Sequence, residues 1–246
     1  MTKPLSGRVS RGGANRVSTA QSSAEKESTV RGVPQSVIDN LRGTRGHMAP
    51  GEQTSDVIQQ DYAKVGINIS AQEAQRIYDD LRDYTLDGFA FIREAWLKQQ
   101  RGETLTSQEQ NYLKGYSLIN EYTHIAPTMK INANDQVYRG ISNDNLSYSK
   151  KLSALKSGDT FDLDRPSSFS TKAMVAEMYA DWGNLIGGIQ GFILHINGKD
   201  LHHSPSISGL SYYISEDEVL VNDRMWRVKA TNMDTYNHKH IYLEKI

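Results

Sequence analysis

The spacing of apolar residues changes at Pro127, and this change constrains the fold more than any other feature of the sequence. Before it, apolar side chains recur about every 3.6 residues, as on amphipathic helices. After it, short apolar and β-branched runs are separated by Gly, Asn, Asp and Pro, as strands are by turns. Helices followed by strands predict an α+β domain rather than a doubly wound parallel sheet. A chain of 246 residues can bury one core, so we expect a single folded domain at residues 54–246.

The first half of this domain, residues 54–127, predicts a helical lobe. A short amphipathic helix is expected to end near Gly66. The segments Ser70–Glu73 and Thr106–Glu109 have the form of capping boxes, in which a hydroxyl bonds a free amide of the first turn and a glutamate reaches back. We therefore expect helices to begin at both segments, with a break near residues 85–88 in the helix that begins at Ser70.

The second half, residues 128–246, predicts a β-rich lobe. One helix, at about residues 172–182, interrupts it, because apolar side chains recur there at helical spacing. The strands are expected at residues 136–139, 159–163, 191–196, 219–221, 225–229 and 240–243.

Residues 1–50 are expected to form a disordered, basic leader rich in Ser and Gly. Up to residue 34 it has six Lys or Arg against two Glu and few aliphatic residues, so it cannot bury enough apolar surface to offset its ordering entropy. Two interpretations stay open: a flexible terminus, and an export signal that specialised bacterial secretion systems recognise without cleavage. No apolar stretch follows the basic residues, so we expect neither a classical signal peptide nor a membrane span.

The charge balance and the lack of cysteine exclude several kinds of partner and site. The net charge is −1, from 28 basic and 29 acidic residues, so no net field attracts nucleic acid or an anionic membrane. Without Cys there are no disulfides, thiol nucleophiles or Cys-ligated metals. The pairs His202–His203 and His238-x-His240 are candidate metal ligands, but adjacent histidines point to opposite faces of a strand, and we expect no metal.

Three short motifs carry side chains suited to a charged ligand. Arg139, followed by Gly140, ends a predicted strand, where a guanidinium can hold a phosphate or carboxylate through paired hydrogen bonds. Ser168–Thr171 places hydroxyls at a strand-to-helix junction, where they can bond a carboxylate or cap the helix. Glu216 and Glu218 point to the same face if their strand begins early. Each motif also has an ordinary interpretation, respectively a surface arginine, a helix cap and an acidic sheet edge.

In order and spacing these motifs resemble the Arg-Ser-Glu class of mono-ADP-ribosyltransferases, whose last motif is Glu-x-Glu. The class includes bacterial toxins, secreted effectors and phage enzymes. The resemblance covers most of residues 70–246 and includes Tyr84–Phe89, similar to a pattern in the family's helical lobe, and Ser170–Tyr179. It implies an ADP-ribosyltransferase-like fold, with a helical N-terminal lobe and a mixed two-sheet β core. It also implies cleavage of NAD as co-substrate and transfer of ADP-ribose to a protein, without a metal.

The resemblance assigns a role to each motif. Glu218 would stabilise the positive charge that builds on the ribose, and Glu216 would orient or deprotonate the acceptor. Arg139 would bind the NAD diphosphate, and the backbone of Gly140 would bond the nicotinamide amide. Ser170 would hold Glu218 in place.

Two loops are implied by the same resemblance. Residues 183–190 would cover NAD, and Ser204–Ser215 would recognise the acceptor through Leu210 and Tyr212–Tyr213. The chain departs from many relatives in having Lys172 after Ser-Thr instead of Ser or Thr. A lysine there could reach an NAD phosphate or lie in solvent.

The acceptor and the destination are the least constrained parts of this expectation. Glu-x-Glu relatives usually modify arginine, so arginine is the expected acceptor residue, and threonine on ubiquitin is the alternative. Small GTPases and actin are further candidates among host proteins. An NAD glycohydrolase and a non-catalytic binding or virion protein are the competing functions. We expect signal-peptide-independent secretion into the host cytosol, with phage delivery into a bacterial cytoplasm as the alternative.

Overall fold

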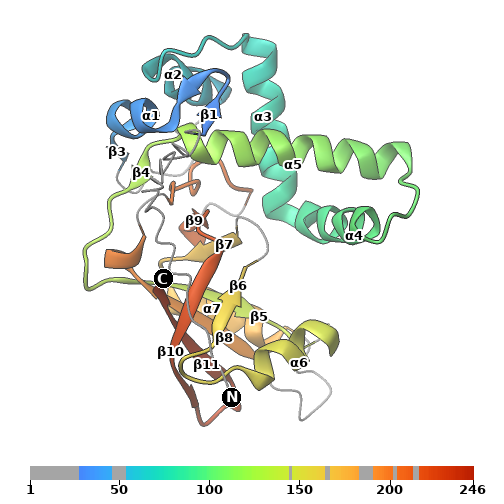
Figure 1. Ribbon diagram of the computed structural model, residues 1–246, viewed down its shortest axis with the longest axis vertical. Coiled ribbons are helices and arrows are strands. Elements are labelled where there is room, and N and C mark those ends of the chain that lie inside the picture. Colours follow the sequence, from blue (N-terminus) through green and yellow to red (C-terminus); the bar gives the residue numbers. More distant parts are fainter. Residues whose placement is uncertain are drawn as a thin grey trace, which may run out of the picture.

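A helical lobe and a sheet lobe make up the molecule (Figure 1). The computed structural model describes residues 28–45, 54–143, 146–163, 167–182, 191–201, 204–212 and 216–246. Helices α1 to α5 form the first lobe, and a seven-stranded sheet with α6 and α7 forms the second. The predicted α+β class and the order of the lobes are confirmed.

Capping side chains begin two helices where the sequence predicts them. Ser70 Oγ accepts a hydrogen bond from Glu73 N at 3.1 Å, and Thr106 and Glu109 form a complete capping box. The first predicted helix ends before Gly66, whose φ of +80° favours glycine. The helices are α2 (Ser55–Lys64), α3 (Ala71–Asp83), α4 (Phe89–Gln100) and α5 (Ser107–Ile125).

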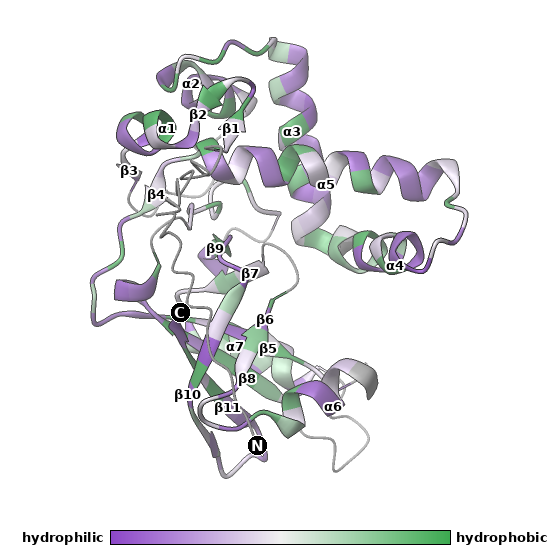
Figure 2. Ribbon diagram, in the orientation of Figure 1, coloured by the Kyte–Doolittle hydropathy of each residue, from purple (hydrophilic) through white to green (hydrophobic). Residues whose placement is uncertain are grey.

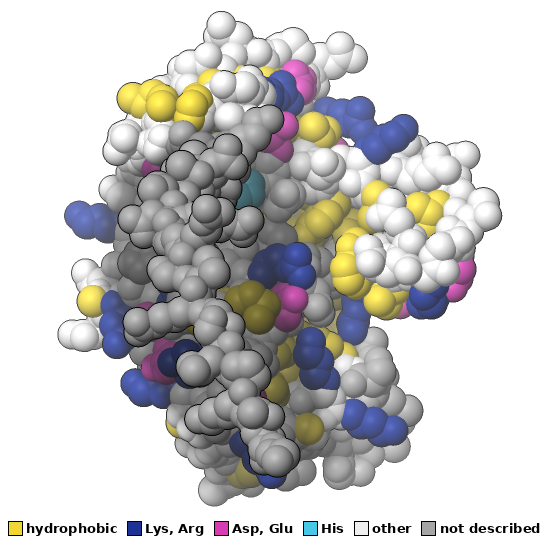
Figure 3. All heavy atoms as spheres, in the orientation of Figure 1, with side chains coloured by type: hydrophobic (Ala, Val, Ile, Leu, Met, Phe, Trp, Pro, Cys, Tyr) yellow, Lys and Arg dark blue, Asp and Glu magenta, His cyan; other side chains and the backbone are white. Residues whose placement is uncertain are grey.

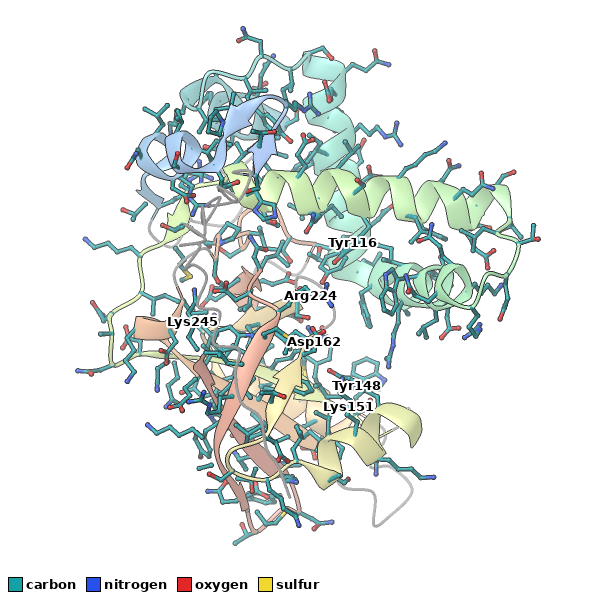
Figure 4. The ribbon with its side chains drawn as sticks, in the orientation of Figure 1. Tyr116, Tyr148, Lys151, Asp162, Arg224 and Lys245 are labelled. Carbon is teal, nitrogen blue, oxygen red and sulfur yellow. The ribbon has the colours of Figure 1, made fainter. Side chains whose placement is uncertain are left out.

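The predicted break in the second helix is a π-helical turn, η1 (Tyr84–Gly88), between α3 and α4. A Cβ at Gly88 would lie 2.7 Å from the carbonyl oxygen of Asp83, so the turn requires glycine. After it the chain changes direction, and α4 with the first half of α5 forms an arm at the side of the lobe (Figure 1). Arg93 of α4 lies 5.1 Å over the ring of Tyr148, which Figure 4 shows on the facing surface of the sheet lobe.

The expectation that residues 1–50 are disordered is wrong for residues 28–45. They form β1 (Thr29–Val30), β2 (Val33–Pro34), α1 (Gln35–Arg42) and β3 (Thr44–Arg45). Ile38 of α1 is fully buried in the helical core, and Arg31 and Arg45 form ion pairs with Glu73 and Asp61 of that lobe. Tertiary contacts with residues far along the chain therefore order a segment whose composition is polar. Residues 1–27 and 46–53 lie outside the described residues.

The seven strands follow the order β6-β10-β11-β8-β5-β7-β9, with β8 and β11 parallel and the other pairs antiparallel. We expected two sheets. The strands instead form one continuous hydrogen-bonded order, in which the pair β7-β9 joins the other five strands through a single register pair, Tyr138 of β5 and Ser170 of β7. The strands are β5 (Gln136–Ile141), β6 (Thr160–Asp162), β7 (Ser167–Ser170), β8 (Phe192–Asn197), β9 (Glu218–Val221), β10 (Met225–Met233) and β11 (Lys239–Lys245), with β4 (Thr128–Met129) paired to β3.

Two helices pack on the sheet, α6 (Leu146–Ala154) and α7 (Ala173–Asp181). The sequence predicts α7 but not α6. The ammonium of Lys239 on β11, a buried residue, donates to the carbonyls of Leu152, Ser153 and Leu155 at 2.7–3.1 Å. A cation from a distant strand thus bonds carbonyls at the end of α6 and of the residue that follows it.

Each lobe has its own apolar core. Figure 2 shows hydrophobic residues in green on the elements of both lobes. Ile207 and Leu210 come from the sheet half of the chain, yet they are fully buried in the core of the helical lobe. Pro205 and Ser206 of the same segment form isolated bridges with Thr128 and Val219. We call residues 204–212 the interlobe segment, because it pairs beside β9 and packs in the other lobe.

Candidate active site

A pocket between the two lobes contains the residues of all three sequence motifs. Its walls include Arg139, Ser168, Ser170, Tyr179, Glu216 and Glu218 from the sheet lobe, and Tyr84, Thr85 and Phe89 from the helical lobe. Figure 3 shows the surface hollowed between the arm and the sheet lobe, with apolar side chains on the arm beside it. Residues far apart in the sequence therefore converge at one place.

The two glutamates reach the pocket through a turn at Asp217, and not through strand alternation. Strand β9 begins only at Glu218, so the early strand start that would place both glutamates on one face by alternation does not occur. Asp217 has a φ of +49°, in the left-handed region that Asp tolerates better than most residues. Lys172 Nζ pairs with Asp217 Oδ2 at 2.8 Å, so the residue that departs from the family pattern contacts this turn.

The carboxylate of Glu218 is buried and held by serines. Ser211 Oγ donates to Glu218 Oε2 at 2.8 Å, and the Ser168 side chain also bonds the carboxylate. Burial raises the pKa of Glu218 to about 7, although both serines and the nearby Arg139 oppose the shift. A carboxyl group that titrates near neutral pH within a pocket is typical of functional sites.

Glu216 lies at the same pocket but is only partly buried. The hydroxyl of Tyr179 donates to Glu216 Oε1 at 3.0 Å. Partial burial raises the pKa of Glu216, and the Tyr179 hydrogen bond opposes this shift. The side chain is therefore oriented and still in contact with the pocket.

The hydroxyl of Ser170 does not make the contact that we expected. It donates to the backbone carbonyl of Glu216 at 2.5 Å and accepts from Lys172 N at 2.9 Å. Ser170 therefore fixes the backbone before Asp217, while Ser168 and Ser211 hold the Glu218 carboxylate.

Arg139 and Gly140 lie on β5 at the pocket wall. Arg139 Nη1 contacts Ser168 O at 3.5 Å, which engages one of the five N–H groups of a guanidinium. A Cβ at Gly140 would lie 1.8 Å from the carbonyl oxygen of Ala176 on α7. A Cβ at Gly191 would likewise lie 2.5 Å from the carbonyl oxygen of Ala180 on the same helix. These glycines let α7 lie directly on the sheet, which brings Tyr179 to the pocket.

Most of Ser204–Ser215, the segment expected to recognise the acceptor, is buried. Residues 204–211 are all buried, Leu210 among them, because the segment packs between the lobes. Tyr212 is 47% exposed; its amide donates to Thr85 Oγ1 at 2.8 Å, and Arg82 lies 5.3 Å over its ring. Tyr213 and the predicted covering loop, residues 183–190, lie outside the described residues.

Sequence reasoning missed the contacts of Ser211, Tyr179 and Thr85. Ser211 is one of four serines between residues 204 and 211, and nothing in the sequence distinguishes it from the others. Tyr179 and Thr85 fall in segments that resemble the family, but their partners come from other elements. Only the fold specifies these hydrogen bonds.

Three of the histidines, His195, His238 and His240, belong to a hydrogen-bonded chain in the sheet lobe. His195 bonds His240 at 2.8 Å, and Asp234 bonds both His240 and His238. His238 also bonds Asp181 at 2.7 Å. Among the described residues, no group of three or more His, Asp or Glu is arranged to hold a metal ion, and no helix is long and apolar enough to cross a bilayer. His202 and His203 are outside this part of the chain.

Known structures show what fold this arrangement belongs to. No protein-family model and no curated protein matches the sequence. Among solved structures, the Vis toxin, an ADP-ribosyltransferase from Vibrio splendidus, is 17% identical with a TM-score of 0.51 over 91% of this chain and 88% of that one. The structure of Vis with the M6 inhibitor is 17% identical, with a TM-score of 0.53 over 90% of this chain and 87% of that one. The structure of Vis with agmatine is 18% identical, with a TM-score of 0.52 over 80% of this chain and 88% of that one. The chain has the ADP-ribosyltransferase fold, as expected.

Proposed function

We propose that the protein cleaves NAD and transfers ADP-ribose to an arginine side chain of a protein acceptor. The observation that carries this proposal is the convergence of Glu216, Glu218 and Arg139 in one pocket of an ADP-ribosyltransferase fold. The pocket supplies a cation for a diphosphate, a buried carboxylate for a forming positive charge and a second carboxylate for an acceptor.

Glu218 is suited to the bond-breaking step. Nicotinamide leaves as a neutral molecule, so the leaving group needs no acid, but positive charge develops on the ribose. A carboxylate that is already oriented stabilises that charge without reorganisation. Ser168 and Ser211 provide this orientation, and the buried surroundings strengthen the interaction.

Glu216 is suited to the acceptor. A guanidinium must be oriented, and must lose a proton, before its nitrogen can attack the ribose carbon. The raised pKa of Glu216 makes it a better proton acceptor than an exposed glutamate. Arginine is favoured as acceptor because the structurally similar Vis has been solved with agmatine, a small guanidine. The same likeness to a toxin supports a role as a secreted effector acting on host protein.

Labelled NAD with agmatine as acceptor tests this proposal. Glu218→Gln should lower both nicotinamide release and transfer by about 100-fold or more. Glu216→Gln should lower transfer by about 100-fold while nicotinamide release to water continues. Glu177→Gln, an exposed glutamate on α7, is the matched control and should change neither.

The products that the wild-type protein forms also distinguish the alternative functions. Nicotinamide release without labelled agmatine or protein would instead support an NAD glycohydrolase. Neither product would contradict both enzymatic functions. Transfer to agmatine that survives Glu216→Gln would show that the role proposed for Glu216 is wrong.

A further inference from the structure

Helix α7 presents four rows of side chains, each with a different environment. Ala176 and Ala180 face the sheet and are buried. Val175 and Tyr179 line the pocket. Residues four apart on a helix lie on one face, so the row beyond these two consists of Met174, Met178 and Trp182, the residue that follows the helix. The remaining row is polar, with Glu177 and Asp181.

The row of Met174, Met178 and Trp182, here called the Met-Trp row, is strongly exposed. The three residues are 73%, 47% and 68% accessible to solvent. Single exposed apolar residues are ordinary, but three large ones aligned along one helix form a patch that water solvates poorly. Methionine adapts its shape to a partner, and tryptophan is among the residues that contribute most to binding.

The Met-Trp row is next to the pocket on the surface of the helix. Tyr179, in the neighbouring row, stacks on Trp182 with ring centroids 6.3 Å apart and donates to Glu216. The Met-Trp row therefore borders the side of the pocket where Glu216 lies. Tyr212, half-exposed, is held to Thr85 of the pocket wall from the helical lobe.

We propose that the Met-Trp row is the docking surface for the protein acceptor, an inference that rests on the proposed function. The partner is a folded protein with an apolar patch beside the arginine that is modified. The exposed polar row adds Glu177 at the border, so basic residues at the edge of the partner's patch complement the surface. The row supplies affinity for the protein, while Glu216 and Glu218 supply the chemistry.

The test uses the full chain with two substitutions, Met174→Ser and Met178→Ser. Neither residue lines the pocket. The matched control is Met225→Ser with Met233→Ser, which removes two methionines of similar exposure, 49% and 47%, from β10. Three rates are measured with labelled NAD: nicotinamide release to water, transfer to agmatine, and transfer to the soluble proteins of a cell lysate.

The proposal expects the first variant to lose about tenfold or more of its labelling of lysate proteins, because part of the docking surface is gone. Nicotinamide release and agmatine transfer should stay within about twofold of the wild type, and the control should change none of the three rates. Protein labelling that falls no further than agmatine transfer would overturn the proposal. A wild type inactive with NAD and agmatine would instead overturn the proposed function.

Two other occupants of the row give distinct results. If the chain itself covers the row, the first variant should lower Tm and raise KM for NAD while the control does not. If a second copy covers it, sedimentation should show a wild-type dimer that the first variant dissociates. Either result, with protein and agmatine transfer changed alike, would contradict docking of an acceptor.

Discussion

The chemistry of the pocket is set at the scale of single side chains, above all by the burial of Glu218. Removing a carboxyl group from water favours its neutral form, and here it raises the pKa to about 7. The same burial that weakens ionisation makes the carboxylate a stronger stabiliser of positive charge once it is formed. Protonation of Glu218 near neutral pH should therefore reduce the activity proposed for the pocket.

This effect of protonation predicts the pH dependence of NAD cleavage. In the proposed reaction the active form of Glu218 is the carboxylate. Because its pKa lies above the usual value, kcat/KM for nicotinamide release should rise with pH and level off above about 7. Below that midpoint the rate should fall about tenfold per pH unit. A rate profile between pH 5 and 9 measures this. A rate that stays level down to pH 5, as the ordinary glutamate pKa of about 4.3 would give, would contradict it.

Ser211 should act on the reaction through Glu218. Its hydrogen bond favours the charged carboxylate, so Ser211→Ala should lower kcat about tenfold and move the midpoint of the pH profile upward. KM for NAD should change little, and Ser211→Thr, which keeps a hydroxyl, should restore part of the rate. Ser206→Ala, in the same buried segment, is the control for loss of packing. An unchanged midpoint in Ser211→Ala would show that the serine does not position Glu218.

At the scale of elements, the attachment of α6 depends on one lysine. Lys239→Met removes a buried ammonium that donates to three backbone carbonyls. We expect the free energy of unfolding to fall by about 2–3 kcal/mol. Lys229→Met, on the neighbouring strand and exposed, should change it by less than about 0.5 kcal/mol. Urea unfolding of both variants measures the difference, and equal losses would refute a special role for Lys239.

The elements that the sequence predicts are those whose signals are local. Ser70 and Thr106 begin helices because their hydroxyls bond amides three residues away, and such bonds can be read from spacing alone. Helix α6 could not be predicted, because the partner of its last carbonyls is some 85 residues further along the chain. The turn at Asp217 was missed for a similar reason, since Lys172 and Ser170 contact it from other elements.

At the scale of the whole molecule, the folded domain begins earlier than composition suggests. Residue 28 already takes part, because Ser28 O accepts from Gln35 N, and Ile38 fills the helical core. Deleting residues 1–27 should leave Tm and NAD cleavage within error of the full chain. Deleting residues 1–45 should lower Tm by at least about 10 °C, because it removes Ile38 and leaves Asp61 buried without Arg45. Similar Tm values for both truncations, measured by calorimetry, would show that residues 28–45 do not belong to the domain.

The interlobe segment also limits how such a molecule can be rebuilt. Ile207 and Leu210 are part of the helical core, and the next residue, Ser211, holds Glu218. The candidate active site thus has no boundary at Pro127, where the spacing of apolar residues changes. A chimera that joined this sheet lobe to the helical lobe of another protein would contain every motif of the pocket. It would still lack the packing that places Ser211, so the two halves must be inherited or engineered together.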